Sequence, residues 1–181
     1  MKKILSLIFS TFLFLSCQHE TYNFTEIDTP TEIAERAFNF AELYEQSETV
    51  YVWGGQDPVR SAIKIDCSGL IVMSYKYALV DTKYKLLEND MTANYMYQTS
   101  TIIDKSNLRK GDLIFMGEAD NDKITHIAVF EKSENGIIYF IDSTQKDTNG
   151  DGVDDVNGVT RRNYSENDKR FKAFGIMRVK Y

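Results

Sequence analysis

The stretch KIDCSGLIVMSYKYAL, from Lys64 to Leu79, places a cysteine between an aspartate and a serine-glycine pair, where a loop becomes an apolar helix. Asp66 stands at the position of an N-cap residue, so Cys67 falls in the first turn of the predicted helix. Unpaired backbone N–H groups and the helix dipole favour a thiolate there. A cysteine in an apolar helix is more often an inert core residue, so both interpretations stay open at this point.

The first seventeen residues have the pattern of an export signal. Two lysines precede an apolar run from Ile4 to Leu15 that is too short to span a bilayer comfortably. The following Ser16-Cys17 pair resembles the lipobox of bacterial lipoproteins, in which the cysteine is lipidated and becomes the new N-terminus. We therefore expect residues 1–17 to be a lipoprotein signal peptide and Cys17 to carry lipid. Ordinary cleavage nearby, with Cys17 left as a spare thiol, is the alternative.

Length and charge limit what the mature chain can be. About 160 residues remain after processing, enough for one core and too few for two ordinary domains. The net charge of -6 argues against nucleic acid and against docking on an anionic surface. We expect a tether over residues 18–29 and one globular domain over residues 30–181. The expected location is the bacterial envelope, as a lipid-anchored, periplasm-facing monomer in the outer rather than the inner membrane.

The periodicity places helices first and strands afterwards. Start signals and apolar spacing predict a helix that is capped by Thr29 or Thr31 and continues to about Glu45, and a second helix after Asp66. Residues 89–107 are polar and predict one short helix with loop. Short β-rich runs then follow, separated by Gly, Asn and Asp, at residues 112–116, 124–131, 137–143, 159–162 and 174–179. This order predicts an α+β domain with helices packed on an antiparallel sheet.

Composition limits the partners available to a nucleophilic cysteine. His126 is the only histidine outside the tether, and it opens the alternating run HIAVFE. The loop Glu134–Gly136 predicts a hairpin with a three-residue connection. That register opposes Ala128 to Asp142, and it therefore places Asp142 beside His126 on the same face. A two-residue Asn-Gly turn would instead put Asp142 on the other face.

Four blocks of sequence, in this order, resemble the NlpC-type cell-wall peptidases, which are papain-like cysteine enzymes. The blocks are Tyr51–Gly55 (YVWGG), Asp66–Leu70 (DCSGL), Gly111–Phe115 (GDLIF) and His126–Phe130 (HIAVF). The resemblance covers about Ile33 to Val179. It implies a circularly permuted papain-like fold, in which a helix start supplies the nucleophile and a sheet supplies the histidine.

The resemblance also assigns catalytic roles. It places the nucleophile on Cys67, the base on His126 and the third polar residue on Asp142. The family frequently has a histidine at that third position, so Asp142 is a departure in residue type. An aspartate is chemically adequate because an anion stabilises an imidazolium at least as well as a neutral ring does.

Three further residues receive substrate-binding roles from the same resemblance. Tyr51 would hydrogen-bond the reacting carbonyl, and Asp66 and Ser68 would bind the amine of a stem peptide. Simple aromatic packing is the alternative for Tyr51, and it is the role that we expect for Trp53.

The implied activity is hydrolysis of amide bonds in peptidoglycan stem peptides, commonly between γ-D-glutamate and a diamino acid. No cofactor is expected for catalysis, and the expected partners are the stem peptide and, through the lipid, a membrane. Two alternatives remain. One is a non-catalytic wall-binding lipoprotein, and the other is an amidase or acyl transferase that uses the same Cys-His pair.

One motif lies outside these blocks. Residues 147–155, DTNGDGVDD, follow the pattern of calcium loops, with oxygen ligands at alternate positions and a turning glycine at the sixth. The ligands would be Asp147, Asn149, Asp151, Val153 and Asp155. The twelfth position, where a bidentate glutamate belongs, is Gly158. A structural calcium and an acidic, solvated turn between two strands are therefore equal expectations.

Overall fold

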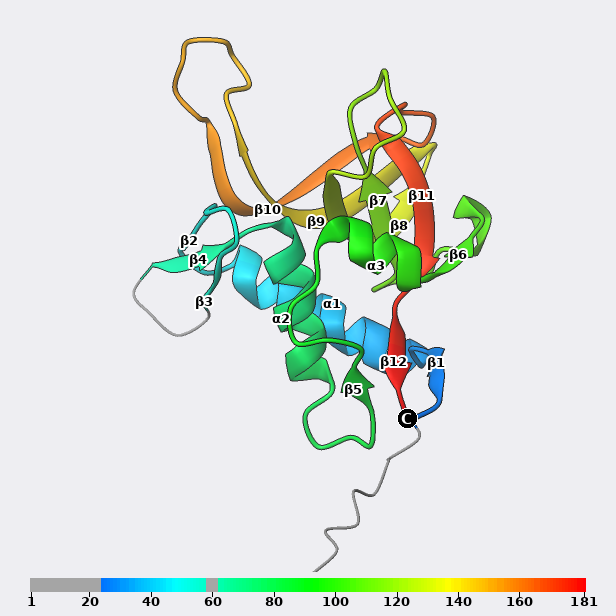
Figure 1. Cartoon of the computed structure of the whole chain (residues 1–181). Helices are drawn as coiled ribbons and strands as arrows, with labels where there is room; N and C mark the ends of the chain where they lie inside the picture. Colours follow the sequence, from blue (N-terminus) through cyan, green and yellow to red (C-terminus); the bar gives the residue numbers. More distant parts are fainter. Residues whose placement is uncertain (1–23, 58–61) are drawn as a thin grey trace, which may run out of the picture.

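The structure, a computed structural model, describes residues 24–57 and 62–181 (Figure 1). The predicted signal peptide, the predicted lipidation site Cys17 and residues 18–23 of the predicted tether lie outside the described residues. Within the two described ranges, no helix combines the length and the apolar character needed to cross a membrane.

Two long helices form where the apolar spacing predicts them. The helices are α1 (Thr31–Glu45), α2 (Cys67–Ala78) and the short α3 (Ala93–Thr99), followed by a 3-10 turn, η1 (Lys105–Asn107). The expected threonine cap of α1 is wrong, because Pro30 occupies the N-cap position and no side chain caps this helix. The hydroxyl of Thr29 instead donates to the carbonyl of Met177 at 2.6 Å.

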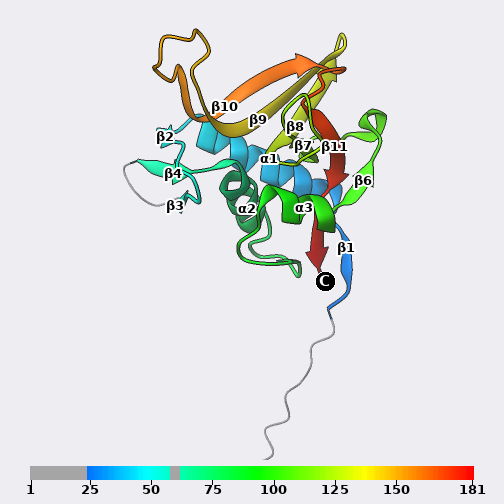
Figure 2. The ribbon, with the colours of Figure 1, turned by 45° about the horizontal axis from the view of Figure 1, so that its top comes forward.

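A six-stranded antiparallel sheet with the order β10-β9-β8-β7-β11-β6 forms the body of the domain (Figures 1 and 2). Its strands are β6 (Thr101–Ile103), β7 (Leu113–Met116), β8 (His126–Glu134), β9 (Ile137–Lys146), β10 (Val156–Ser165) and β11 (Phe171–Ile176). The predicted α+β class with an antiparallel sheet is confirmed.

Two small sheets complete the fold. In one, β12 (Arg178–Lys180) lies between β1 (Glu26–Asp28) and β5 (Lys85–Leu86). In the other, β4 (Ile63–Ile65) lies between β2 (Thr49–Val50) and β3 (Gln56–Asp57). The first sheet corrects the predicted tether boundary, because residues 26–28 belong to the folded domain and the tether cannot extend to Thr29.

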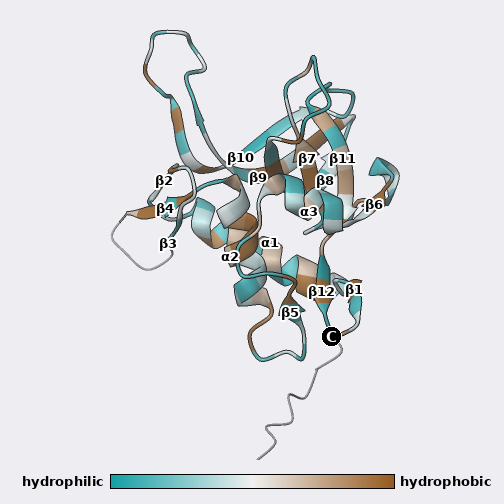
Figure 3. Ribbon diagram, viewed as in Figure 1, coloured by the Kyte–Doolittle hydropathy of each residue, from teal (hydrophilic) through white to brown (hydrophobic). Residues whose placement is uncertain are grey.

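The main core lies where α1 and α2 pack on the sheet. Nearly every side of α2 is covered, since nine of its twelve residues are buried. Figure 3 shows the apolar residues gathered in this region and the long β9–β10 loop as mostly hydrophilic. Alternate residues of the same strands, such as Ile114, Ala128 and Phe140, form a second apolar cluster. Burial on both faces fixes the register of these strands.

The β8–β9 hairpin reaches the predicted register by a different route. Its turn has two residues, Asn135 and Gly136, both with positive φ, so the predicted three-residue loop is wrong. Such a turn alone would move Asp142 to the opposite face. A register shift between Phe130 and Lys132 inserts one extra residue in β8 and restores the pairing of Val129 with Ile141. The bulge therefore returns Asp142 to the face of His126.

Gly111 sits where α1, α2 and β7 meet, with a φ of +95°. A Cβ at this position would lie 2.1 Å from the carbonyl oxygen of Ala34 in α1. The carbonyl of Gly111 accepts a hydrogen bond from the Tyr75 hydroxyl of α2 at 2.8 Å. A glycine is therefore required here both by backbone conformation and by space.

We predict that Gly111→Ala lowers the free energy of unfolding by about 2–4 kcal/mol, because a left-handed backbone strain adds to a steric clash. Gly136→Ala is the matched control: its φ is +74°, but no atom lies within 4 Å of the added Cβ. The control should lose only about 1–2 kcal/mol. Equal losses in urea denaturation of the two variants would contradict the close approach of α1 to residue 111.

Candidate active site

Asp66 fixes the start of α2 and the loop before it. It is the N-cap of α2, and its Oδ1 accepts the backbone N–H of Gly69 at 2.6 Å and the Ser68 hydroxyl at 2.9 Å. Its Oδ2 accepts the backbone N–H of Gly54 at 2.7 Å. The predicted cap is thus confirmed, and Cys67 is held as the first residue of the helix.

The glycine of the Asp-Cys-Ser-Gly block allows this loop to approach the helix. A Cβ on Gly69 would lie 2.2 Å from the carbonyl oxygen of Gly55. That loop is also anchored by the backbone N–H of Asp66, which donates to the same Gly55 carbonyl at 3.1 Å. Any larger residue at position 69 would separate the loop from the cysteine.

A second link joins the cysteine segment to the sheet. The hydroxyl of Ser143 in β9 donates to the carbonyl of Ile65 at 2.7 Å, and both groups are buried. Ser143 is the neighbour of Asp142, and Ile65 lies two residues before Cys67. This bond therefore sets the distance between the nucleophile segment and the strand that carries the carboxylate.

His126, Asp142 and Arg162 form a row across three neighbouring strands. His126 Nε2 lies 2.5 Å from Asp142 Oδ2. Arg162 Nε donates to Asp142 Oδ1 at 2.9 Å, and its Nη2 also contacts Oδ2. The Asp142 side chain has no exposed surface, whereas 21% of the His126 side chain is exposed. The carboxylate is thus an internal anion held between two cationic groups.

This environment sets the protonation of the pair. Burial raises the pKa of Asp142, but the hydrogen bonds and charges of His126 and Arg162 outweigh it and lower the pKa below its ordinary value. Burial lowers the pKa of His126, but Asp142 and Cys67 outweigh it and raise the pKa to about 9. Asp142 is therefore an acceptor, and Nε2 of His126 is the donor.

Cys67 lies close enough to the same ring to help raise the His126 pKa. Because Nε2 is bonded to Asp142, Nδ1 is the nitrogen available to the sulfur. The structure thus brings together the three residues that the sequence predicts, in the order cysteine, imidazole, carboxylate. Cys67 is buried and free, with no disulfide.

Tyr51 lies close enough to interact electrostatically with the cysteine. Burial, Cys67 and Asp66 together raise the pKa of the Tyr51 hydroxyl above its ordinary value. The backbone N–H of Tyr51 donates to Asn157 Oδ1 at 2.9 Å, which fixes this loop on β10. Trp53 in the same loop is 85% exposed, so the expected aromatic packing of Trp53 is wrong.

A family profile described as the NlpC/P60 family matches residues 48–167, about two thirds of the chain. The chain belongs to the NlpC/P60 family. Two relatives from Escherichia coli K12 are each 32% identical to this chain. The match to "Probable endopeptidase YafL" covers 61% of this chain and 41% of the relative. The match to "Murein DD-endopeptidase MepH" covers 49% of this chain and 30% of the relative. The chain thus spans less than half the length of these curated relatives.

A solved structure, NlpC2 from Trichomonas vaginalis, has the same fold. It is 22% identical, with a TM-score of 0.55 over 84% of this chain and 48% of its own. At this identity the likeness concerns the fold alone, and it agrees with the predicted NlpC-type architecture.

Sequence reasoning did not assign Arg162 to this NlpC/P60 site. The residue lies in a strand that the sequence predicts, and it pairs with Phe140, two residues from Asp142 on the same face. Only the register of β9 against β10 shows that its guanidinium reaches the carboxylate. An arginine between Thr160 and Tyr164 on the half-buried face of the strand was the available signal.

Two predicted substrate-binding residues, Asp66 and Ser68, form hydrogen bonds with other groups of the protein. Asp66 uses both carboxylate oxygens for the cap and the loop, and Ser68 donates its hydroxyl to Asp66. These contacts give both residues a structural role. Their binding of a substrate amine stays a prediction.

The predicted calcium loop connects β9 and β10 and is exposed. Its carboxylates accept hydrogen bonds from the loop itself: Asp147 from the N–H groups of Gly150 and Gly152, and Asp155 from Thr148. Among the described residues no group of three or more His, Cys, Asp or Glu side chains is arranged to hold a metal ion. Calcium binding at Asp147, Asn149, Asp151, Val153 and Asp155 stays a prediction.

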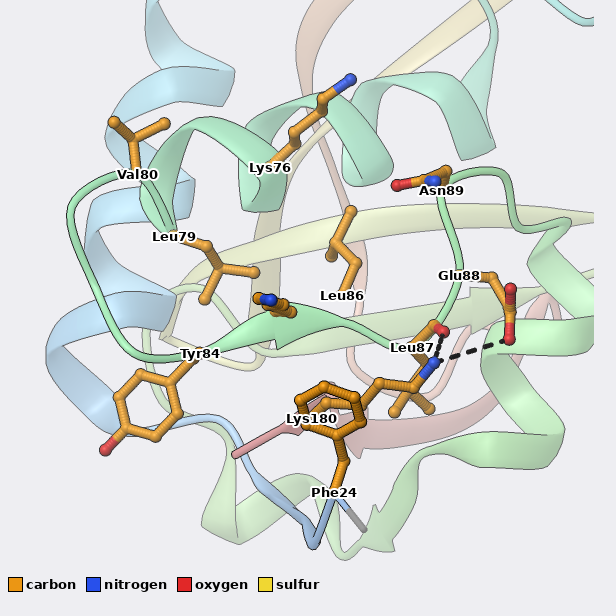
Figure 4. Close-up of a pocket in the computed structure, with 11 residues that line it drawn as sticks. Phe24, Lys76, Leu79, Val80, Tyr84, Leu86, Leu87, Glu88, Asn89 and Lys180 are labelled. Carbon is orange, nitrogen blue, oxygen red and sulfur yellow. Dashed lines mark hydrogen bonds and ion pairs between the residues drawn. The ribbon is translucent and has the colours of Figure 1, made fainter. Parts of the chain in front are cut away.

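A pocket of about 510 Å³ lies away from this site, at the C-terminal end of α2 (Figure 4). Apolar side chains such as Leu79 and Leu86 line it together with lysines. Lys180 contacts the Leu87 carbonyl and lies 3.8 Å from Glu88. No cysteine and no histidine line this pocket, so it is not the candidate active site.

We predict that the His126 imidazole titrates near pH 9 instead of near 6.5. The folded protein is stabilised by this charge below pH 6.5, and the stabilisation is lost as the pH rises through about 9. Histidine ring NMR, assigned with His126→Gln, measures the midpoint. Asp142→Asn should move the midpoint downward, because it removes the anion. A wild-type midpoint at or below 6.5 would contradict the His126–Asp142 pairing.

Proposed function

We propose that this NlpC/P60 protein is a cysteine peptidase that hydrolyses amide bonds in peptidoglycan stem peptides. The observation that carries the proposal is the row of Cys67, His126 and Asp142, with the cysteine at a helix start. The family and the endopeptidase names of its relatives YafL and MepH support a peptidoglycan hydrolase in general. The intact reactive pair favours an enzyme over a non-catalytic wall-binding lipoprotein.

In the first half-reaction the Cys67 sulfur attacks the carbonyl carbon of the amide. An imidazolium at His126 and the N-terminus of α2 both favour negative charge on the sulfur. The carbonyl oxygen becomes an oxyanion, and the backbone N–H of Cys67 is a donor for it, because the first residue of a helix has no acceptor within that helix. The Tyr51 hydroxyl is the second donor, and each such donor contributes a few kcal/mol.

His126 then donates its Nδ1 proton to the leaving nitrogen, the C–N bond breaks, and a thioester remains on Cys67. In the second half-reaction the neutral ring accepts a proton from water. The resulting hydroxide equivalent attacks the thioester and releases the carboxylic acid. Asp142 keeps Nε2 protonated throughout, which leaves Nδ1 for the proton transfers.

Two bonds are candidates for cleavage. The resemblance in the sequence blocks points to the bond between γ-D-glutamate and a diamino acid. The relative MepH is named a murein DD-endopeptidase. The second candidate is therefore a peptide bond that joins two centres of D configuration. An amidase or acyl transferase would use the same thioester with a different leaving group or acceptor. Lipid attachment at Cys17 and an envelope location complete the proposal, and their support is the signal pattern in the sequence.

We predict that Cys67→Ala abolishes release of soluble peptide fragments from purified cell-wall material, a loss of at least about 100-fold, because Cys67 is the only cysteine in residues 24–57 and 62–181 that could form the thioester. Mass spectrometry of the fragments detects the release and identifies the cleaved bond. The matched control, Cys17→Ala, removes the other cysteine and should retain full activity on soluble stem peptides. Activity that persists in a folded Cys67→Ala protein would disprove the mechanism.

A further inference from the structure

A pocket of about 300 Å³ opens beside the catalytic histidine and does not include Cys67. Three strands supply much of its polar lining: His126 comes from β8, Thr144 and Lys146 from β9, and Arg162 and Tyr164 from β10. Glu118 and Thr125, between β7 and β8, and Arg170, just before β11, complete it. This volume is at the lower end of the range for small-ligand sites, so it suits a single amino-acid residue.

The lining is cationic in a protein whose net charge is -6. Lys146, Arg162 and Arg170 face a single lining carboxylate, Glu118. Two of these cations already form ion pairs with carboxylates that do not line the pocket. Arg162 pairs with Asp142, and Arg170 lies 2.7 Å from Asp168. Lys146 has no ion pair within 4 Å among residues 24–57 and 62–181. Its charge acts on Asp168 without direct contact. The ammonium therefore keeps its N–H donors for a ligand.

The two arginines are held in place and shape the pocket. The Arg162 guanidinium uses Nε and Nη2 on Asp142 and donates from Nη1 to the Tyr164 hydroxyl at 2.6 Å. Arg170 stacks on the Tyr164 ring, 3.6 Å from its centroid. A preorganised wall of this kind favours binding, because few side chains lose freedom when the ligand enters.

The reaction places one part of the substrate at this pocket. His126 protonates the leaving nitrogen, so that nitrogen must come within hydrogen-bond distance of the ring. The carbonyl carbon is bonded to the Cys67 sulfur at this stage, so the other atoms attached to the nitrogen extend away from the sulfur. The pocket that His126 itself lines is the space available to them.

We propose that this pocket binds a carboxylate carried by the leaving-group residue of the substrate, with Lys146 as its ion-pair partner. The inference rests on the proposed function and adds a specificity to it. Lys146 supplies N–H donors, and the Thr144 hydroxyl lies in the same lining. Both match the two acceptor oxygens of a carboxylate. In a diamino diacid the carboxylate is that of the side chain or that of the main chain.

The test uses soluble stem peptides whose leaving residue is a diamino diacid. One peptide keeps both carboxylates, and two others carry an amide at the side-chain or the main-chain carboxylate. The wild-type protein should cleave the full diacid with a kcat/KM about tenfold above that of one of the amidated peptides, which corresponds to one charge-assisted hydrogen bond. The amidated peptide that loses activity identifies the recognised carboxylate.

In Lys146→Gln the kcat/KM for the diacid peptide should fall to that for the amidated peptide. The kcat/KM for the amidated peptide itself should change little. The matched control is Lys132→Gln, a lysine of β8 that pairs with Glu134 and lies outside this pocket. The control should keep the wild-type preference. Equal rates on all three peptides in the wild type, or a uniform loss in Lys146→Gln, would overturn the inference while leaving the proposed function intact.

Binding to Cys67→Ala protein separates the two claims. If the wild type cleaves no peptide, the proposed function fails. Titration calorimetry with the Cys67→Ala protein still shows whether the pocket binds the carboxylate. Diacid binding that weakens about tenfold on amidation, and again in Cys67→Ala/Lys146→Gln, supports the inference. Binding that is indifferent to both changes rejects it.

Discussion

The hydrogen bond between the His126 ring and the buried Asp142 carboxylate determines how the rest of the site is organised. A carboxylate without exposed surface is costly unless it is paired, and Asp142 is paired on both sides, by His126 and by Arg162. Its charge fixes which ring nitrogen is protonated and which one faces the sulfur. The orientation of the imidazole, and with it the chemistry of Cys67, follows from this one anion.

The fold brings this pair to the cysteine through contacts of long sequence separation. Ser143, the neighbour of Asp142, is bonded to Ile65, which precedes the Asp66 cap. The cap and the close approach of Gly69 to Gly55 then hold the loop and the helix start as one unit. Strand β9 thus positions both the base and the nucleophile, and displacement of this strand would disturb both.

Local rules predicted much of this arrangement. Asp66 as an N-cap, the two long helices and the strand-rich last third follow from side-chain type and periodicity, and composition leaves His126 as the only histidine of the domain. The hairpin shows the limit of such rules. The bulge between Phe130 and Lys132 depends on packing of both faces of β8, so the register was predicted correctly from an incorrect turn. Arg162 was missed because a nine-residue loop separates β9 from β10. A loop of this length does not determine which residues of the two strands pair. Strand β1 was missed because three residues paired with the C-terminus carry no periodic signal.

The central claim is that His126 activates the sulfur of Cys67, and the rate at which iodoacetamide alkylates Cys67 at pH 7 tests it without any substrate. Mass spectrometry of the peptide that contains Cys67 separates this reaction from alkylation of Cys17. The structure predicts that His126→Gln slows alkylation of Cys67 about tenfold or more, while His19→Gln leaves the rate unchanged. Equal rates in the wild type and in a folded His126→Gln protein would contradict the account.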